Sequence, residues 1–444
     1  MLLAWLYLPW KLTVEEVGQF ALLSFVIDLL SRISAMGMDS ALLRFYVDAS
    51  RRARVFASAG SCLGVGSIVA AAAIWLTWNI VPAVFDGLVP VYHHVAFLVL
   101  GVALAVTMAN TVLVHYIASH EASRFGRLNT IRCLILAGGY MLGASIGLGL
   151  IGLLFSQLIA SLAVLVFFWL ARPFNDQPFR PDKSTMRELL IYSFPMLFYG
   201  LFSVVSDYSG RLALESQVSL GAMGIFQFYN QIANQINGFW TSINRAWTPH
   251  VFQQLEADQS AADASITRFS LWGTLACAAG IMLMMMLNLV GFGSLLIPPA
   301  YLARIDLFYL LLLGPLFCCI YTAIYPVFYF DKSTLKISLI QSMICMFTTC
   351  LTFAFTVSFK SEGAALSWPL GIFLTPIVYI LFFPALRVRL APNLAILLIW
   401  GAAGTMMAYA LLSHHSTPWA IAALLLGATG TAFLGRVKLA INSA

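Results

Sequence analysis

Residues 152–171 read GLLFSQLIASLAVLVFFWLA, a stretch with no charged side chain. A membrane-spanning helix needs about 20 mostly apolar residues, so this stretch alone is long enough to cross a bilayer. Apolar runs bounded by charges or helix breakers recur along the whole chain, and they predict an all-α polytopic membrane protein with about 13 full transmembrane helices. The runs lie at about 16–36, 55–77, 93–118, 129–150, 152–171, 188–210, 222–243, 269–292, 305–330, 335–358, 363–385, 393–412 and 417–435.

The composition of the 444-residue chain supports this prediction. Only 9% of its residues are charged and 61% are hydrophobic, whereas soluble domains are roughly 25% charged. This excludes a soluble enzyme, a disordered chain and a coiled coil. The net charge of +6 does not indicate a nucleic-acid partner, because in a membrane chain the distribution of charge matters more than its sum. The seven cysteines show no CxxC spacing, so we expect no disulfide framework, metal site or cofactor.

The first apolar segment, residues 1–10, is short. Ten helical residues rise about 15 Å, half of a bilayer core, so we interpret the segment as part of a truncated first helix. We expect that the native start lies upstream or that the chain is a truncated product. Counting this segment as a crossing places nineteen Lys and Arg residues on one side and four on the other. The bias predicts that both termini are cytoplasmic.

The chain is predicted to have two halves. A Pro-rich, charged stretch at 172–187 reads as a linker, and we expect a bundle at 1–180, a second at 181–390 and two additional helices at 391–444. A shift of 206 residues aligns polar positions that follow one helical face in both halves, an internal repeat typical of transporters. The shift places Ser24, Asp28, Ser31 and Ala35 on Asn230, Asn234, Asn237 and Thr241, and Asp39 on Arg245.

Two charged residues lie in the second predicted crossing. Asp28 and Arg32 are four residues apart, so they can pair on one helical face. An ionisable side chain in hydrocarbon costs roughly 2.5–3.5 kcal/mol on insertion scales. The two residues are therefore either a self-neutralised structural pair or a cavity site, in which Asp28 is the candidate for ion coupling.

The eighth predicted crossing carries a broad polar face that ends at Arg245. Its amides either join helices or line a cavity that suits sugars, because Asn and Gln both donate and accept hydrogen bonds. Arg245 either binds phosphate or anchors the helix end at the interface. The face comprises Gln227, Asn230, Gln231, Asn234, Gln235, Asn237, Thr241, Asn244 and Arg245.

The seventh crossing ends with Asp207 and Arg211, again four residues apart. They form either a surface ion pair or the mouth of a cavity. No histidine has carboxylate or cysteine neighbours at a ligand spacing, and we find no phosphate loop or nucleophile elbow. A transporter is therefore expected, and not an enzyme.

Three segments carry a family resemblance: LTVEEVGQF at 12–20, MDSALLRFY at 38–46, and the stretch from GIF at 224–226 to AWTP at 246–249. They resemble the lipid-linked oligosaccharide (polysaccharide) flippases of the multidrug/oligosaccharidyl-lipid/polysaccharide exporter superfamily. The resemblance implies two pseudo-symmetric six-helix bundles around a central cavity, followed here by two extra helices. It also implies that Arg32, Arg245 and the Asn234 face line the substrate cavity.

The activity implied by the resemblance is the flipping of undecaprenyl-diphosphate-linked glycans across the bacterial inner membrane, for lipopolysaccharide or exopolysaccharide biosynthesis. Alternating access would be coupled to protons or sodium, with membrane lipids, a glycan polymerase and a chain-length regulator as candidate partners. A multidrug or cation antiporter of the same fold is the near alternative, although it favours acidic, aromatic-lined sites. A glycan polymerase needs a substantial outer loop, and the predicted outer loops are short. A scaffold has no use for so long a polar face.

Overall fold

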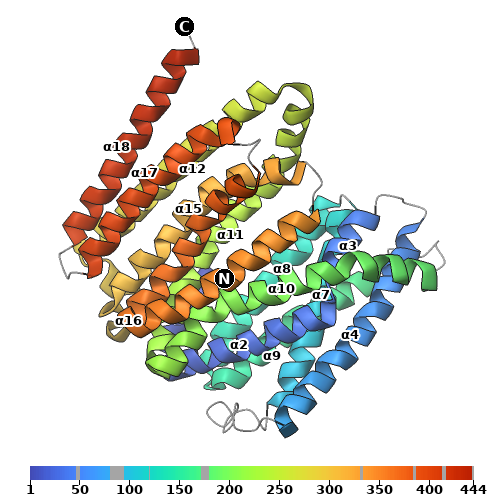
Figure 1. Ribbon diagram of the computed structural model, residues 1–444. Coiled ribbons are helices and arrows are strands. Elements are labelled where there is room, and N and C mark those ends of the chain that lie inside the picture. The colour runs from blue at the N-terminus through green and yellow to red at the C-terminus, as the bar shows by residue number, and fades with distance from the viewer. Residues whose placement is uncertain are drawn as a thin grey trace. The chain divides into compact units, whose positions relative to one another are not determined.

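The computed structural model (Figure 1) describes residues 1–46, 51–80, 95–119, 121–171, 180–330, 334–383, 387–412 and 417–442. All regular elements in these ranges are helices, as predicted. Nine of the described helices are long and apolar enough to cross a membrane, and the chain is a multi-pass membrane protein. It divides into two compact units, Met1–Val205 and Ser206–Ala444, with the boundary inside one long helix.

The first unit consists of helices, and several consecutive ones are separated by only a few residues. Residues 1–10 form two short pieces, and the helix that follows them is the first one long enough to span a bilayer. The elements are α1 (Leu2–Tyr7), η1 (Leu8–Trp10), α2 (Val14–Ala35), α3 (Met38–Phe45), α4 (Arg52–Ile80), α7 (Ala96–Ala118), α8 (Ala122–Ser145), α9 (Gly149–Ala171) and the first part of α10 (Lys183–Gln217).

The limits of α2 follow from its sequence. Thr13 accepts a hydrogen bond from the Glu16 N–H at 3.2 Å, and the Glu16 carboxylate accepts one from the Thr13 N–H at 2.8 Å. This capping box satisfies two free amides at the helix start. At the other end, Met36 and Gly37 are left-handed, with φ of 48° and 72°. A Cβ on Gly37 would lie 2.5 Å from the Ser193 carbonyl oxygen, so glycine permits both the bend into α3 and the close approach of α10.

Helix α2 packs at the centre of the first unit, against α4, α7 and α9. Its apolar side chains are almost fully buried, and burial of such side chains is the main stabilising term inside a protein. Together with residues from the neighbouring helices they form one cluster, which contains Leu23, Ile27, Leu30, Ala70, Val95, Val99, Val102, Ala103 and Leu154.

Asp182 fixes the start of α10. Its carboxylate accepts hydrogen bonds from the Ser184 hydroxyl and from the Thr185 N–H and hydroxyl, the last two at 3.0 and 2.8 Å. These bonds favour the charged form and lower the pKa of Asp182 to about 2. The first part of the predicted linker, residues 172–179, lies outside the described residues.

The second unit is built around α15. About 94% of the apolar window of this helix is buried, and it packs against α11, α12, α16 and α17. Helices α17 and α18 lie side by side next to this core (Figure 1). The elements are the end of α10, α11 (Leu220–Ala257), α12 (Gln259–Leu289), α13 (Gly293–Leu296), α14 (Pro299–Leu302), α15 (Ile305–Phe330), α16 (Thr334–Phe382), α17 (Arg387–Leu412) and α18 (Thr417–Asn442).

Helix α16 contains a sharp break, at the place where the sequence predicts two helices. Lys360 has non-helical angles, φ 49° and ψ −126°, and a Cβ at Gly363 would overlap the carbonyl oxygen of Phe355. Arg304, in front of α15, pairs with Glu362 just after this break at 2.5 Å. The ranges 335–358 and 363–385 therefore correspond to the two segments of α16.

Several helices extend beyond their apolar runs, which corrects the predicted boundaries. Helix α10 continues to Gln217 and α11 to Ala257, while α8 begins at Ala122. Arg132 lies ten residues inside α8, within the predicted range 129–150. The helices extend beyond their apolar runs because polar and charged residues such as Arg are good helix formers, so hydropathy marks the apolar stretch but not the end of the helix.

Candidate functional site

The predicted polar face lies on α11, which packs against α15, α12 and α16. Asn230 is buried, Asn234 and Asn237 are half-buried, and Thr241 is exposed, with its hydroxyl donating to the Asn237 carbonyl oxygen at 3.0 Å. Exposure therefore increases from Asn230 to Thr241, whereas Asn244 further along the face is buried again.

Two amides of the predicted polar face have buried atoms without hydrogen-bond partners in the described part of the chain. They are both side-chain polar atoms of Gln227, which is 0% exposed, and the Oδ1 atom of Asn237. Buried polar groups normally have a partner, either protein or water. Among the described residues, these free atoms do not join helices through hydrogen bonds, and their burial means that they do not face an open cavity in this structure either.

Arg245 lies twelve residues before the end of α11, and not at the end of the helix as the sequence suggested. Its side chain falls outside the described side chains. The neighbouring Trp247 stacks on Phe269 of α12 with ring centroids 4.3 Å apart. Trp240 meets the same ring edge-on at 6.4 Å, so both indoles pack between helices.

Asp207 and Arg211 lie on the part of α10 that belongs to the second unit. Asp207 is exposed and interacts electrostatically with Cys345 of α16. Arg211 is only 4% exposed, and its guanidinium lies 4.1 Å from the Tyr208 ring centroid, a cation–π arrangement. Burial places Arg211 away from the surface position that one interpretation gave it.

A charged cluster that the sequence analysis did not find lies in the first unit. Asp28 of α2 interacts electrostatically with Arg132 and Tyr140 of α8. The Arg132 Nη1 donates to Asn110 Oδ1 of α7 at 2.7 Å, and the Gln157 Nε2 of α9 donates to the Tyr140 hydroxyl at 2.9 Å. Four helices therefore contribute to one polar network, with Asp28 as its acid and Arg132 as its cation.

The charged centre of this network lies well inside three helices, of which α2 and α7 are candidate membrane spans. Asp28 is seven residues from the end of α2, Asn110 eight from the end of α7, and Arg132 ten from the start of α8. At 1.5 Å per residue, these positions are roughly 10–15 Å from the helix ends. Ionisable groups at such depth are costly and are functional candidates by default.

Arg32 is exposed, and it lines a cavity of about 80 Å³ together with Asp39 and Tyr199, where α10 meets the bend between α2 and α3. Its charge acts on the Asp39 carboxylate. The sequence pattern predicted Asp28 as the partner of Arg32 and had no signal for Asp39, because the left-handed bend at Gly37 redirects the chain between them.

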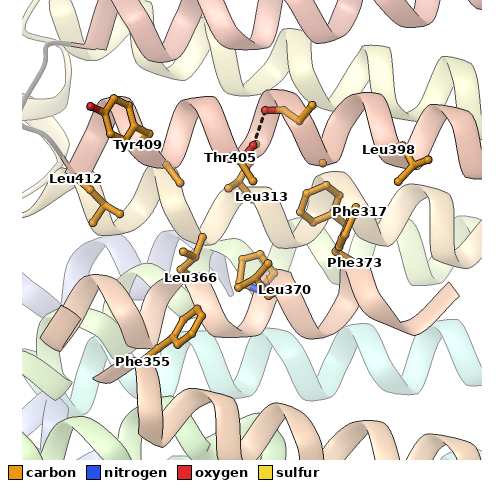
Figure 2. Close-up of a pocket in the computed structure, with 15 residues that line it drawn as sticks. Leu313, Phe317, Phe355, Leu366, Leu370, Phe373, Leu398, Thr405, Tyr409 and Leu412 are labelled. Carbon is orange, nitrogen blue, oxygen red and sulfur yellow. Dashed lines mark hydrogen bonds between the residues drawn. The ribbon is translucent and has the colours of Figure 1, made fainter. Parts of the chain in front are cut away.

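A cavity of the second unit is apolar. It has a volume of about 550 Å³ and lies between α15, α16 and α17 (Figure 2). None of its lining residues is charged. The Thr405 hydroxyl already donates a hydrogen bond to the Ala402 carbonyl oxygen at 2.8 Å. Such a cavity suits a hydrocarbon ligand and not a glycan or diphosphate. The side chains that line it include Leu313, Phe317, Phe355, Leu366, Phe373, Leu398 and Tyr409.

No group of three or more His, Cys, Asp or Glu residues is placed to hold a metal ion in the described residues. The seven cysteines are free thiols.

The chain matches the family model of polysaccharide biosynthesis proteins over residues 2–255, more than half of its length. The structure of the lipid II flippase MurJ in an inward closed conformation is similar, with a TM-score of 0.66 at 13% identity, covering 99% of this chain and 96% of that one. An inward-facing multidrug resistance MATE family transporter of the MOP superfamily has a TM-score of 0.64 at 13% identity, over 88% and 94% of the two chains.

A MOP superfamily transporter from Pyrococcus furiosus gives a TM-score of 0.53 at 14% identity, over 92% of this chain and 91% of that one. No curated protein sequence matches the chain. At these identities the likeness establishes the fold, which is that of the MATE and MurJ transporters. The family predicted from the sequence is confirmed.

Proposed function

Because the chain belongs to the polysaccharide biosynthesis protein family, we propose that it flips a lipid-linked oligosaccharide, carried on undecaprenyl diphosphate, across the bacterial inner membrane. The substrate moves by alternating access coupled to an ion gradient. In this proposal the chain acts as a transporter and not as an enzyme, has both termini in the cytoplasm, and works beside a glycan polymerase and a chain-length regulator.

The observation that carries this proposal is the polar face of α11. A glycan that leaves water must exchange its hydrogen bonds for others, since an unpaired polar group in an apolar medium costs several kcal/mol. Asn230, Asn234, Asn237 and Thr241 supply neutral donors and acceptors along one face, and the Oδ1 atom of Asn237 has no partner among the described residues. This supports sugar binding by neutral groups.

The diphosphate needs positive charge. A guanidinium donates two parallel hydrogen bonds to a phosphate, and we assign this role to Arg245 and Arg32. Asp207 and Arg211 are proposed to lie at the mouth of the same cavity. The full fold in this proposal has thirteen crossings and a truncated first helix, arranged as two six-helix bundles around the cavity with α17 and α18 outside them.

Asp28 is the proposed coupling residue. It is an acid at membrane depth with a fixed cation, Arg132, within electrostatic range. A proton or sodium ion that binds Asp28 weakens its attraction to Arg132, so ion binding can change how α2 and α8 interact. We expect Asp28→Asn to lower gradient-driven transport when the rate is normalised to the amount of reconstituted protein. If the transport rate of Asp28→Asn depends on the ion gradient as the wild-type rate does, Asp28 has a purely structural role.

The apolar cavity between α15, α16 and α17 fits the hydrocarbon part of such a substrate. Its lining is made almost entirely of Leu, Phe and small residues (Figure 2), and burial of apolar surface gives about 25 cal/mol per Å². The lipid portion therefore has an apolar place to bind, separate from the polar face of α11.

Complementation tests the proposal. In a strain that lacks its own flippase, the wild-type chain should restore surface glycan. Arg245→Lys should restore part of it, because lysine keeps the positive charge but loses the two parallel hydrogen bonds of the guanidinium. Arg245→Gln should restore very little. Arg268→Gln, which removes an exposed arginine from α12, is the matched control and should behave as wild type. If the Arg245→Gln variant inserts normally and still restores surface glycan to the wild-type level, Arg245 does not bind phosphate. It would then serve only to anchor the helix at the membrane interface.

A multidrug antiporter is the second candidate, favoured by the structural likeness to the MATE family transporter. It would export cationic drugs without a lipid carrier. Drug resistance conferred by the wild-type chain, with no effect on surface glycan, would support it.

A further inference from the structure

The bend between α2 and α3 carries two opposite charges in one small cavity. Arg32 precedes the bend and Asp39 follows it, and α10 closes the cavity with Met196, Tyr199 and other residues. A volume of about 80 Å³ has room for a few water molecules, since one needs about 10–15 Å³ of such space. The site can therefore exchange protons with water.

The two charges differ in their surroundings. Arg32 is exposed, whereas the Oδ1 atom of Asp39 is buried and has no hydrogen-bond partner among the described residues. A carboxylate that loses water without gaining hydrogen bonds is destabilised relative to its protonated form. Asp39 lies beyond the spanning residues of α2, and burial raises the pKa of its carboxyl while the Arg32 charge opposes this shift.

Other ionisable groups lie near this pair: Asp28 is four residues before Arg32 on α2, and Arg44 of α3 lies over the Tyr192 ring of α10 at 4.9 Å. Of the described residues, Arg32 is the charged side chain that acts on Asp39, and Tyr199 is the titratable group that α10 adds to the cavity wall.

Two ionisable groups of the neighbouring helices contact Tyr46 at the end of α3: His115 Nδ1 of α7 pairs with the Tyr46 hydroxyl at 2.5 Å, and Arg52 Nε of α4 donates to the Tyr46 carbonyl oxygen at 3.0 Å. The remaining contacts of α4 and α7 with this region are made by apolar side chains and the thiol of one cysteine. These are Val55, Ala59, Cys62 and Leu63 of α4, and Val114 and Ala118 of α7.

We propose that Asp39 is a proton-binding site that controls whether Arg32 is available to a phosphate group of the substrate. With Asp39 ionised, its negative charge neutralises Arg32. When the Asp39 carboxylate takes up one proton and becomes a neutral acid, Arg32 keeps an uncompensated positive charge that attracts an anion. This step rests on the proposed function only in that Arg32 meets the substrate phosphate.

The proton site is tested first, without any substrate. An acid whose pKa is raised by folding imposes no penalty below its unfolded pKa of about 3.9, and the full penalty above its folded pKa. The thermal stability of the purified wild-type chain relative to Asp39→Asn should therefore decrease as pH rises from 4.5 to 8. Glu15→Gln, an exposed acid on α2, should parallel wild type. Parallel curves for wild type and Asp39→Asn would overturn the proposal.

Asp39→Glu keeps a titratable group and should retain the pH dependence, which covers the case in which Asp39→Asn does not fold. Arg32→Gln removes the opposing charge and should shift the transition in stability to higher pH. A transition that does not move would show that Arg32 does not control Asp39.

The control of Arg32 is tested by binding of farnesyl diphosphate to the protein in nanodiscs. Wild type should bind it roughly tenfold more weakly at pH 8 than at pH 6, a difference equivalent to about 1.4 kcal/mol. Asp39→Asn should bind tightly at both values, and the comparison at each pH cancels the titration of the ligand. Equal pH dependence in the two proteins would overturn the control of Arg32. Neither measurement requires glycan transport, so a failure of the proposed function would appear separately, in complementation.

Discussion

Removing the carboxylate of Asp28 should destabilise the first unit, because Arg132 then keeps its charge inside the helix bundle, with the Asn110 oxygen at 2.7 Å as its hydrogen-bond acceptor among the described residues. A lone charge at the centre of a membrane helix costs roughly 2.5–3.5 kcal/mol on insertion scales, and breaking a buried pair costs about 3–5 kcal/mol. Since Arg132 is half-buried, we expect about 2–3 kcal/mol for Asp28→Asn and a similar loss for Arg132→Gln.

The double variant should recover much of this loss, because neither partner is then left charged. Thermal or denaturant unfolding of the purified proteins measures the double-mutant cycle, and contacting residues give coupling energies of about 0.5–3 kcal/mol. The matched cycle pairs Asp28→Asn with Arg127→Gln, an exposed arginine on the same helix, and should be additive. Additivity in the Asp28–Arg132 cycle would refute the assignment of Arg132 as the counter-charge of Asp28.

Three further predictions concern the scaffold. Gly37→Ala should lower stability by more than about 1–2 kcal/mol, the cost of a left-handed Ala, because its Cβ also meets α10 backbone at 2.5 Å; Gly138→Ala, with open space around it, should cost nothing in thermal unfolding. Asp182→Ala should speed hydrogen exchange at the start of α10 at neutral pH, and this difference should vanish as pH falls from about 4 to 2, where the wild-type carboxylate is itself protonated. Glu362→Gln should change the melting temperature little despite the 2.5 Å contact with Arg304, because partly exposed ion pairs contribute about 0–1 kcal/mol.

The all-helical membrane fold was predictable from the sequence because each spanning helix is a long run of apolar residues. Even the break in α16 was visible, since the residues around Lys360 and Glu362 interrupt the apolar run. Helix ends were less predictable, because a helix continues wherever its backbone bonds and packing allow. The extension of α8 is the clearest case, because this helix begins at Ala122, seven residues before its predicted apolar run.

The candidate site was predictable only where it follows one helix. The face of α11 appears in the sequence because Asn230, Asn234 and Asn237 repeat at helical spacing. The partners of Asp28 and Arg32 lie on other helices or beyond the Gly37 bend, and sequence spacing carries no signal for such contacts. The spacing of four residues suggested that Asp28 and Arg32 pair with each other. The structure adds an electrostatic partner for each of them, Arg132 for Asp28 and Asp39 for Arg32.

The central claim is that this chain translocates a glycan attached to a polyprenyl diphosphate. In the most direct measurement, the purified chain is reconstituted in proteoliposomes that contain a labelled undecaprenyl-diphosphate oligosaccharide. A glycan-cleaving enzyme is added outside the vesicles, and cleavage of the labelled lipid that began in the inner leaflet is followed over time. We predict protein-dependent movement that a proton or sodium gradient accelerates and that Arg245→Gln abolishes. An inner leaflet pool that stays protected, while the same vesicles exchange a cationic drug for protons, would contradict the account.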